Sequence, residues 1–171
     1  PLHARVSVRA MLEEAAAPYR SGRARIQISA GPTPDQSGTP LTKAEVERRP
    51  GVIYGLGNII ENATDFAATQ VEIKAEWNAA GLVVTIADDG PGFPAEIMDN
   101  IGEPYVTTRP SEGPEVGDVR DEGASGLGLG FFIAKTLLER SGATVSLSNR
   151  ASPLRGAVVR VQWPRAFILN R

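Results

Sequence analysis

One amphipathic helix, expected over residues 51–68, constrains this chain more than any other segment. Its apolar residues recur at the i, i+3, i+4 and i+7 spacing of one helix face: Val52, Leu56, Ile59, Ile60, Ala63, Phe66 and Ala67. Asn58, Asn62 and Asp65 follow one another at steps of four and three residues, so their side chains lie together along the helix. Polar groups this close to an apolar face are costly to bury without a partner. The pattern therefore fits either a ligand site or asparagines that bond to a neighbouring loop.

The bulk composition excludes several classes of protein. The 171 residues fit one domain with a single core, and 42% apolar with 22% charged residues is typical of a soluble globular protein. A net charge of −2 gives no electrostatic footprint for nucleic acid or an anionic membrane. No run approaches the roughly 18 apolar residues of a membrane helix. The absence of cysteine removes disulfides and thiolate metal sites from this chain.

The remaining periodicities predict helices that alternate with paired strands. Further helices are expected at 8–19, 94–100 and 127–140, and 41–49 is expected to begin a helix that Pro50-Gly51 interrupts. In the last helix the expected inner stripe is Leu129, Phe132, Ile133, Thr136 and Leu137. Strands are expected at 24–30, 70–77, 82–87, 143–149 and 156–163, the third of them buried on both faces.

The order of these elements indicates the fold class. Hairpin-like strand pairs outnumber βαβ units, which disfavours a doubly wound parallel fold. We expect an α+β fold, a two-layer sandwich in which three larger helices cover one face of a mixed sheet. Residues 103–125 are rich in proline, glycine and charge without periodicity, and a stretch of this length is usually a lid or a disordered segment. We interpret it as a lid.

The stretch Asp88-Asp89-Gly90-Pro91-Gly92 follows the apolar strand directly. A carboxylate that leaves a buried strand can accept a hydrogen bond from an exocyclic amine such as that of adenine, and glycines let backbone approach a flat ligand closely. Asp-Gly and Pro-Gly are also ordinary turn dipeptides. Taken alone, this stretch leaves a plain turn as the alternative.

A second glycine-rich stretch, residues 123–130, runs directly into the last helix. Glycines at this position expose backbone N–H groups at a positive helix end, where phosphate can bind. The stretch lacks the Lys-Ser/Thr ending of a Walker A loop, and it follows a lid where a Rossmann fingerprint would follow a strand. A flexible hinge to the lid is the alternative interpretation.

Taken together and in this order, the stretches resemble the ATP-binding domain of sensor histidine kinases, in the wider family of gyrase, Hsp90 and MutL ATPases. Residues 58–63 resemble the N box of that family, 88–92 its G1 box, 103–109 its F box and 126–130 its G2 box. The resemblance covers roughly residues 8–164. The segment from Asn62 and the closing Gln162-Trp163-Pro164 are similar to the RegB/PrrB class of redox-responding kinases.

The resemblance implies a five-stranded, mostly antiparallel sheet of the Bergerat ATP-binding fold, one histidine-kinase-like domain over 1–171, and an ATP lid over 103–125. It implies that Asn62 ligates Mg²⁺, that Asn58 supports the phosphate and metal region, and that Asp88 accepts from the adenine amino group. The implied ATP contacts, beyond those with Asn58, Asn62 and Asp88, come from Asp65, Phe66, Gly90, Gly92, Tyr105, Arg109, Ser125, Gly126, Leu127, Gly128 and Leu129. Asn58 and Asn62 are the implied catalytic residues.

Two positions depart from the pattern of the family. Asp65 stands where many of these kinases have Lys or Arg, and a carboxylate there would repel phosphate, so we expect it to face ribose, water or solvent. Ala157 stands where a threonine often follows the last-strand glycine, so we expect one polar contact near the adenine to be absent.

The implied activity is transfer of the γ-phosphoryl group of Mg-ATP to a histidine on a separate dimerisation domain, for onward transfer to a response regulator. Gyrase-type relatives carry a glutamate as the general base for water where this chain has Asn58, and the helical angle of Glu61 points it away from Asn58 and Asn62. A gyrase-like ATPase and a non-catalytic nucleotide-binding regulatory module, which Asp65 would suit, stay as alternatives.

The chain begins at Pro1 without a methionine, and we expect it to be a piece of a longer protein. Its only histidine, His3, lacks the expected context of a phosphoacceptor, so we expect the dimerisation and phosphoacceptor domain to lie outside this chain. We expect no nucleic-acid partner, a homodimeric full-length protein, and a cytoplasmic location for this domain, with any attachment to the inner membrane in other segments.

Overall fold

The computed structural model describes residues 4–33, 42–99 and 128–169. They form a five-stranded sheet in the order β2-β4-β5-β7-β6. Its strands are β2 (Arg25–Pro32), β4 (Gln70–Asn78), β5 (Gly81–Asp88), β6 (Thr144–Asn149) and β7 (Ala157–Pro164). Only the β2–β4 pairing is parallel, and the other three are antiparallel. The expected mixed, mostly antiparallel sheet is confirmed.

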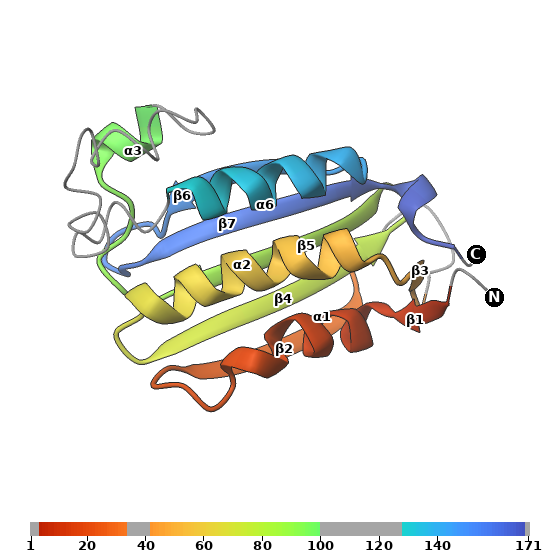
Figure 1. Ribbon diagram of the computed structural model, residues 1–171, viewed down its shortest axis with the longest axis horizontal. Coiled ribbons are helices and arrows are strands. Elements are labelled where there is room, and N and C mark those ends of the chain that lie inside the picture. The colour runs from red at the N-terminus through yellow and green to blue at the C-terminus, as the bar shows by residue number, and fades with distance from the viewer. Residues whose placement is uncertain (1–3, 34–41, 100–127, 170–171) are drawn as a thin grey trace.

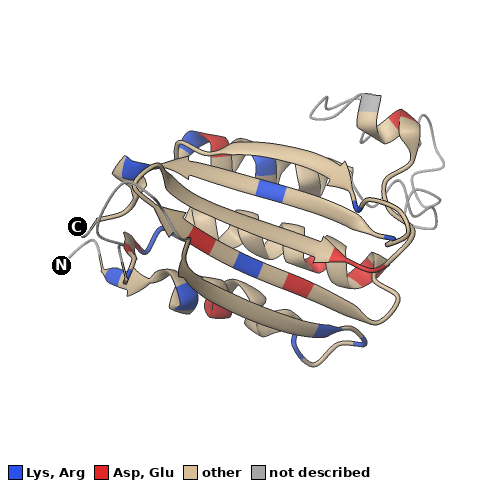
Figure 2. Ribbon diagram, turned by 180° about the vertical axis from the view of Figure 1, so that it is seen from behind, with Lys and Arg blue, Asp and Glu red and all other residues tan. Residues whose placement is uncertain are grey.

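Three helices cover one face of this sheet: α1 (Val8–Ala16), α2 (Pro50–Phe66) and α6 (Leu129–Arg140) (Figure 1). The opposite face carries charged side chains, and none of the described helices lies on it (Figure 2). Alternate residues of β4 therefore differ in burial, with Val71, Ile73, Ala75 and Trp77 facing the helices. The two-layer sandwich is confirmed. No helix among the described residues is long and apolar enough to cross a bilayer.

The free edge of β2 is protected by arginines from the helical layer. Arg20 donates to the carbonyl of Ile26 at 2.9 Å, and Arg9 donates to that of Ile28 at 3.1 Å. Both guanidinium groups also contact Glu13. Carbonyl groups that would otherwise invite another strand are thus occupied.

Residues 41–49 were expected to begin a helix, and that prediction was wrong. The structure has a short strand there, β3 (Glu45–Glu47), which pairs antiparallel with β1 (Arg5–Ser7). Val46 at its centre is fully buried, so the segment is used to close the core. Helix α2 then begins at Pro50, because proline is well suited to the first position of a helix.

The inner stripe expected for α6 was also wrong. Leu129 and Ile133 are 55% and 39% exposed, whereas the buried residues are Phe131, Ala134 and Leu138. The cause is the close approach of α6 to α2. A Cβ on Gly55 would lie 3.0 Å from Leu138 Cγ, so this glycine admits the buried face of α6.

Shorter elements complete the described chain. They are the 3₁₀ helix η1 (Ala17–Tyr19), the helix α3 (Ala95–Asp99) and the 3₁₀ helix η4 (Arg165–Phe167). Both ends of the described chain lie beside β3. The N–H of Arg48 donates to the carbonyl of Ala4 at 2.8 Å, and the N–H of Leu169 donates to that of Glu45 at 2.8 Å. Figure 1 shows β1 and β3 at the end of the sheet opposite α3.

Candidate functional site

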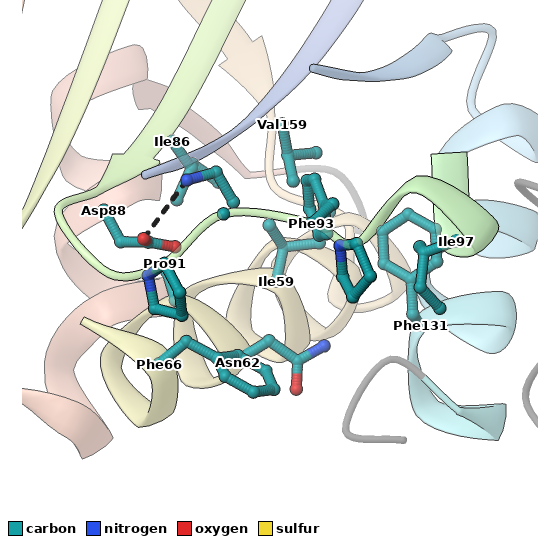
Figure 3. Close-up of a pocket in the computed structure, with 14 residues that line it drawn as sticks. Ile59, Asn62, Phe66, Ile86, Asp88, Pro91, Phe93, Ile97, Phe131 and Val159 are labelled. Atoms are coloured by element: carbon teal, nitrogen blue, oxygen red, sulfur yellow. Dashed lines mark hydrogen bonds between the residues drawn. The ribbon is translucent and has the colours of Figure 1, made fainter. Parts of the chain in front are cut away.

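A pocket of about 190 Å³ opens at the end of the sheet near α3. Its walls come from α2, β5, the loop that follows β5, α3, α6 and β7. They are mostly apolar: Ile59, Ala63, Phe66, Ile86, Pro91, Phe93, Pro94, Ile97, Phe131, Ala157 and Val159. Figure 3 shows Asn62 and Phe66 on α2 with Asp88 and Pro91 close by. Among the residues lining the pocket, Asn62 and Asp88 carry the polar side chains.

Asp88 is the buried polar side chain of this pocket, with 3% of its surface exposed. Its Oδ1 accepts hydrogen bonds from the N–H of Gly90 at 2.8 Å and from the N–H of Ala157 at 3.2 Å (Figure 3 draws the second). Burial raises the pKa of Asp88 above its ordinary value, although these two N–H groups partly oppose the shift. Within the described part of the chain, Oδ2 has no hydrogen-bond partner. A buried acceptor of this kind is open to a donor from a bound ligand or an ordered water.

Glycines allow the backbone to close around Asp88. Gly156 has a φ of +131°, and a Cβ there would lie 1.8 Å from the carbonyl oxygen of Asp88. At Gly90 a Cβ would lie 2.1 Å from the carbonyl oxygen of Phe66. Any larger residue would push apart the segments that frame the pocket, so the short contacts explain both glycines.

Asp89, the next residue, joins the loop after β5 to the loop after α2. Its Oδ1 accepts from the backbone N–H groups of Ala68, Thr69 and Gln70 at 2.8, 2.9 and 3.1 Å, and its Oδ2 accepts from the Thr69 hydroxyl. Burial raises the pKa of Asp89, but the hydrogen bonds from Thr69, Gln70 and Ala68 outweigh it and hold the pKa well below the usual range. This carboxylate fixes the segment that follows α2 against the loop that begins directly after Asp88.

The structure brings together four of the residues that the sequence nominated: Asn62, Phe66, Asp88 and Gly92 all line the pocket. Gly90, in the same loop as Gly92, does not line the pocket and lies against the carbonyl of Phe66. Asn58 is half-buried on α2 but does not line the pocket. Gly128 is buried at the start of α6, and Leu129 is largely exposed. Tyr105, Arg109, Ser125, Gly126 and Leu127, with the expected lid over 103–125, lie outside the described residues.

Asp65 faces a different hollow. Together with Tyr19, Arg23 and Glu61 it lines a more polar cavity of about 300 Å³ beside the end of α2. Burial raises the pKa of Asp65, and Arg23 partly opposes the shift. Neither Asp65 nor Glu61 lines the pocket that holds Asn62. For Glu61 this agrees with its helical angle. Asp65 was expected to lie with Asn58 and Asn62 and to contact ATP, but its side chain lines the other cavity.

Sequence reasoning missed several of the walls. Phe93, Ile97 and Phe131 line the pocket and had not been nominated. Their apolar character carried no chemical signal, and Phe131 was placed on the wrong face of its helix. The structural role of Asp89 was missed as well, because its partners lie about twenty residues earlier in the chain.

A divalent cation would find few protein ligands here. No cluster of three or more histidine, cysteine, aspartate or glutamate side chains occurs within the described ranges. The amide of Asn62 is half-buried at the pocket and is an oxygen donor that Mg²⁺ accepts. Because Mg²⁺ usually takes one or two protein oxygens along with water and substrate phosphates, this donor set suits it.

Comparisons with known proteins agree on one family. A family model for histidine kinase-, DNA gyrase B-, and HSP90-like ATPases matches residues 48–166. The chain is 42% identical over 163 residues to sensor histidine kinase RegB of Cereibacter sphaeroides, which covers 90% of this chain and 34% of that protein. It therefore spans about a third of this curated relative.

Solved structures share the fold. The chain matches the mycobacterial sensor histidine kinase MprB with a TM-score of 0.66 at 17% identity, covering 95% of this chain and 97% of that one. It also matches full-length ShkA, solved in complex with AMPPNP, with a TM-score of 0.65 at 22% identity, covering 99% of this chain and 32% of that one.

Proposed function

The chain belongs to the histidine kinase-, DNA gyrase B- and HSP90-like ATPase family, and we propose that it is the ATP-binding catalytic domain of a two-component sensor histidine kinase. In this proposal it binds Mg-ATP and transfers the γ-phosphoryl group to a histidine on a separate dimerisation domain. The identity with sensor histidine kinase RegB supports the kinase branch of the family. The AMPPNP bound in the ShkA structure supports an adenine nucleotide as the ligand.

The observation that carries the proposal is the state of the Asp88 carboxylate. One of its oxygens is occupied by two backbone N–H groups, and the other is left for a donor inside an apolar pocket. The exocyclic amine of adenine is such a donor, and the apolar walls suit the faces of a flat base. We propose that Phe66 packs against the base or ribose and that Gly90 and Gly92 shape the space.

The phosphate end of the pocket rests on α2. We propose that the Asn62 amide holds Mg²⁺ and that Asn58, one turn earlier, supports it through hydrogen bonds or water. When bound, Mg²⁺ would neutralise charge on the phosphates. Because phosphoryl transfer depends mainly on positioning and charge stabilisation, no covalent residue is needed on this domain. The proposal extends to phosphate contacts from Arg109 and the backbone of 125–129.

Two placements favour transfer over hydrolysis. Asn58 has no basic lone pair with which to activate water, and Glu61, the nearest carboxylate on that part of α2, faces the other hollow. Asp65 also lies away from the pocket, which weakens the case for a degenerate nucleotide-binding module.

The partners of the proposed kinase follow from the reaction. The acceptor would be the dimerisation and histidine phosphotransfer domain of the same kinase, and a response regulator would take the phosphoryl group next. We propose that the full-length protein is a homodimer, that this domain works in the cytoplasm, and that any inner-membrane anchor belongs to other segments.

Calorimetric titration of ATP, with and without Mg²⁺, into the unaltered chain and into Asp88→Asn tests the proposal. In the variant, Oδ1 can still accept from Gly90 and Ala157, but Nδ2 would point a donor at the adenine amine. We expect affinity to fall by about a hundredfold, because a buried donor is left facing a donor. Asp65→Asn, which removes a carboxylate from the other hollow, is the matched control and should bind ATP as before.

The second step is transfer from labelled ATP to a separately supplied histidine-bearing dimerisation domain. Phosphorylation of that domain, lost in Asn62→Ala, would support the kinase assignment. Tight ATP binding without transfer would favour a regulatory module, and steady phosphate release to water would favour an ATPase. If the unaltered chain binds no adenine nucleotide, the proposal fails.

A further inference from the structure

Asn149, the last residue of β6, lies outside the pocket but contacts the loop that forms one of its walls. Its Oδ1 accepts from the N–H of Phe93 at 2.7 Å, and its Nδ2 donates to the carbonyl of Phe93 at 3.0 Å. A single side chain thus satisfies both backbone groups of one residue, as a neighbouring strand would. Phe93 itself lines the pocket.

The contact is close as well as paired. A Cβ on Gly92, whose φ is +89°, would lie 2.9 Å from Asn149 Oδ1. A side chain at position 92 would therefore crowd the Asn149 amide and would have to adopt a positive φ, which glycine adopts without strain. Residues 91–94, which all line the pocket, are held there as a group.

The register of the sheet links this contact to the base-recognising carboxylate. Asn149 pairs with Ala157 across β6 and β7. The N–H of Ala157 donates to Asp88 Oδ1, while the amide of Asn149 holds Phe93. Two neighbouring residues of the sheet therefore hold the two ends of one loop, and so fix the distance between the Asp88 carboxylate and the apolar wall.

We propose that Asn149 is a positioning residue for base recognition, acting through the backbone of Phe93. The inference rests on the proposed function, because it takes an adenine base as the ligand. With the loop held, the wall keeps the base edge at hydrogen-bonding distance from Asp88. Without the amide, the loop is free to move away from β6, and the pocket discriminates less well between bases that differ at the edge facing Asp88.

The test is a comparison of two nucleotides on the 171-residue chain. ATP carries the amine that Asp88 would accept from, and inosine triphosphate carries a carbonyl in its place. In Asn149→Ala we expect ATP affinity to fall about fivefold to tenfold, the effect of two exposed hydrogen bonds, and inosine triphosphate affinity to fall by about twofold or less. The preference for ATP should shrink accordingly.

Two further variants test whether the amide group itself is needed. Asn149→Asp keeps one acceptor for the Phe93 N–H but turns an oxygen toward the Phe93 carbonyl, so it should lose at least as much ATP affinity as Asn149→Ala. Ser146→Ala, at an exposed position of the same strand, should change neither nucleotide. Thermal melts of each variant report on general loss of structure.

The outcomes are distinct. A reduced ATP preference at a nearly unchanged melting temperature supports the inference. Equal losses for both nucleotides, or an Asn149→Asp variant as good as the unaltered chain, would show that the amide only supports the fold. If the unaltered chain binds ATP and Asn149→Ala binds it equally well, the inference alone fails. If the unaltered chain binds neither nucleotide, the proposed function fails and takes this inference with it.

Discussion

Removal of the Asp89 carboxylate should lower the free energy of unfolding more than the loss of a partly exposed side chain usually does. Three backbone N–H groups, of Ala68, Thr69 and Gln70, donate to one of its oxygens. At a position that water can reach, each should contribute about 1 kcal/mol net, near the typical value for a hydrogen bond in a folded protein. Asp89→Ala should therefore lower the free energy of unfolding by about 3 kcal/mol at neutral pH. Asp89→Asn keeps the acceptor but not its charge, and because charge-assisted bonds are roughly twice as strong, it should cost about half as much.

The pH dependence of this loss is a sharper test than its size. The pKa of Asp89 in the folded chain lies well below the ordinary value near 3.9. A carboxyl whose folded pKa is lowered contributes stability that is fully present above its unfolded pKa and is lost as the pH falls toward the folded pKa. The gap between the unaltered chain and Asp89→Asn should therefore stay constant from about pH 5 to pH 8 and narrow below about pH 4.

Urea denaturation followed by circular dichroism at several pH values measures both quantities. Asp65→Asn, in the last turn of α2, is the control. It should change the unfolding free energy by about 0.5 kcal/mol or less, because no hydrogen bond to its carboxylate is found within the described ranges. The reasoning would be refuted by an Asp89→Ala variant less than about 1 kcal/mol below the unaltered chain, or by a gap that is the same at pH 3 and pH 7.

Three other outcomes are expected. Gly57→Ala should raise the free energy of unfolding by up to about 1 kcal/mol, because the new Cβ meets only ordinary contacts in a helix interior. Gly55→Ala should give no such gain, because its Cβ would lie 3.0 Å from Leu138 Cγ. Urea denaturation of the two variants tests this difference. Gly156→Ala should lose more than about 3 kcal/mol by the same assay, since its Cβ would collide with the carbonyl of Asp88. Adenosine affinity, measured by calorimetry from pH 8 downward, should begin to fall at a higher pH than an aspartate of ordinary pKa would give. The reason is that burial raises the pKa of Asp88, whose charged form is the acceptor. An affinity that stays constant down to pH 4 would contradict this.

The sequence predicted those parts of the fold that one periodicity decides. The alternation of apolar and polar residues over 70–77 is compatible only with a half-buried strand, and β4 has that alternating burial. Residues 41–49 were misread because a three-residue strand has no period of its own. Val46 is buried there only because β1, almost forty residues earlier, comes to lie beside it.

The buried face of α6 was misread for a related reason. Its apolar residues nearly encircle the helix, so spacing alone allows more than one inner stripe. The choice is made by Gly55 on α2, which lets Leu138 approach and leaves Ile133 outward. Tertiary contacts of this kind leave no mark on the helix they orient.

In the site, residues whose role follows from their sequence neighbours could be predicted. Residues whose role depends on a partner far away in the sequence could not. Asp88 and Asn62 could be nominated because their polar character conflicts with the apolar residues around them. Asn149 sits in an ordinary serine- and asparagine-containing strand end, and its role depends on Phe93, 56 residues away.

Both described ends of the chain flank β3, at the end of the sheet opposite α3 (Figure 1). The pocket is lined in part by Ile97 of α3 and so lies at that opposite end. Any segment joined to Ala4 or Leu169 is therefore attached to the domain at the end of the sheet that lies far from the pocket. A small rotation about that attachment swings the pocket through an arc set by the full length of the sheet. Because both ends lie far from the pocket, attachment there should leave nucleotide binding unchanged. A sample tethered to a sensor surface through either end should bind nucleotide with the dissociation constant measured free in solution.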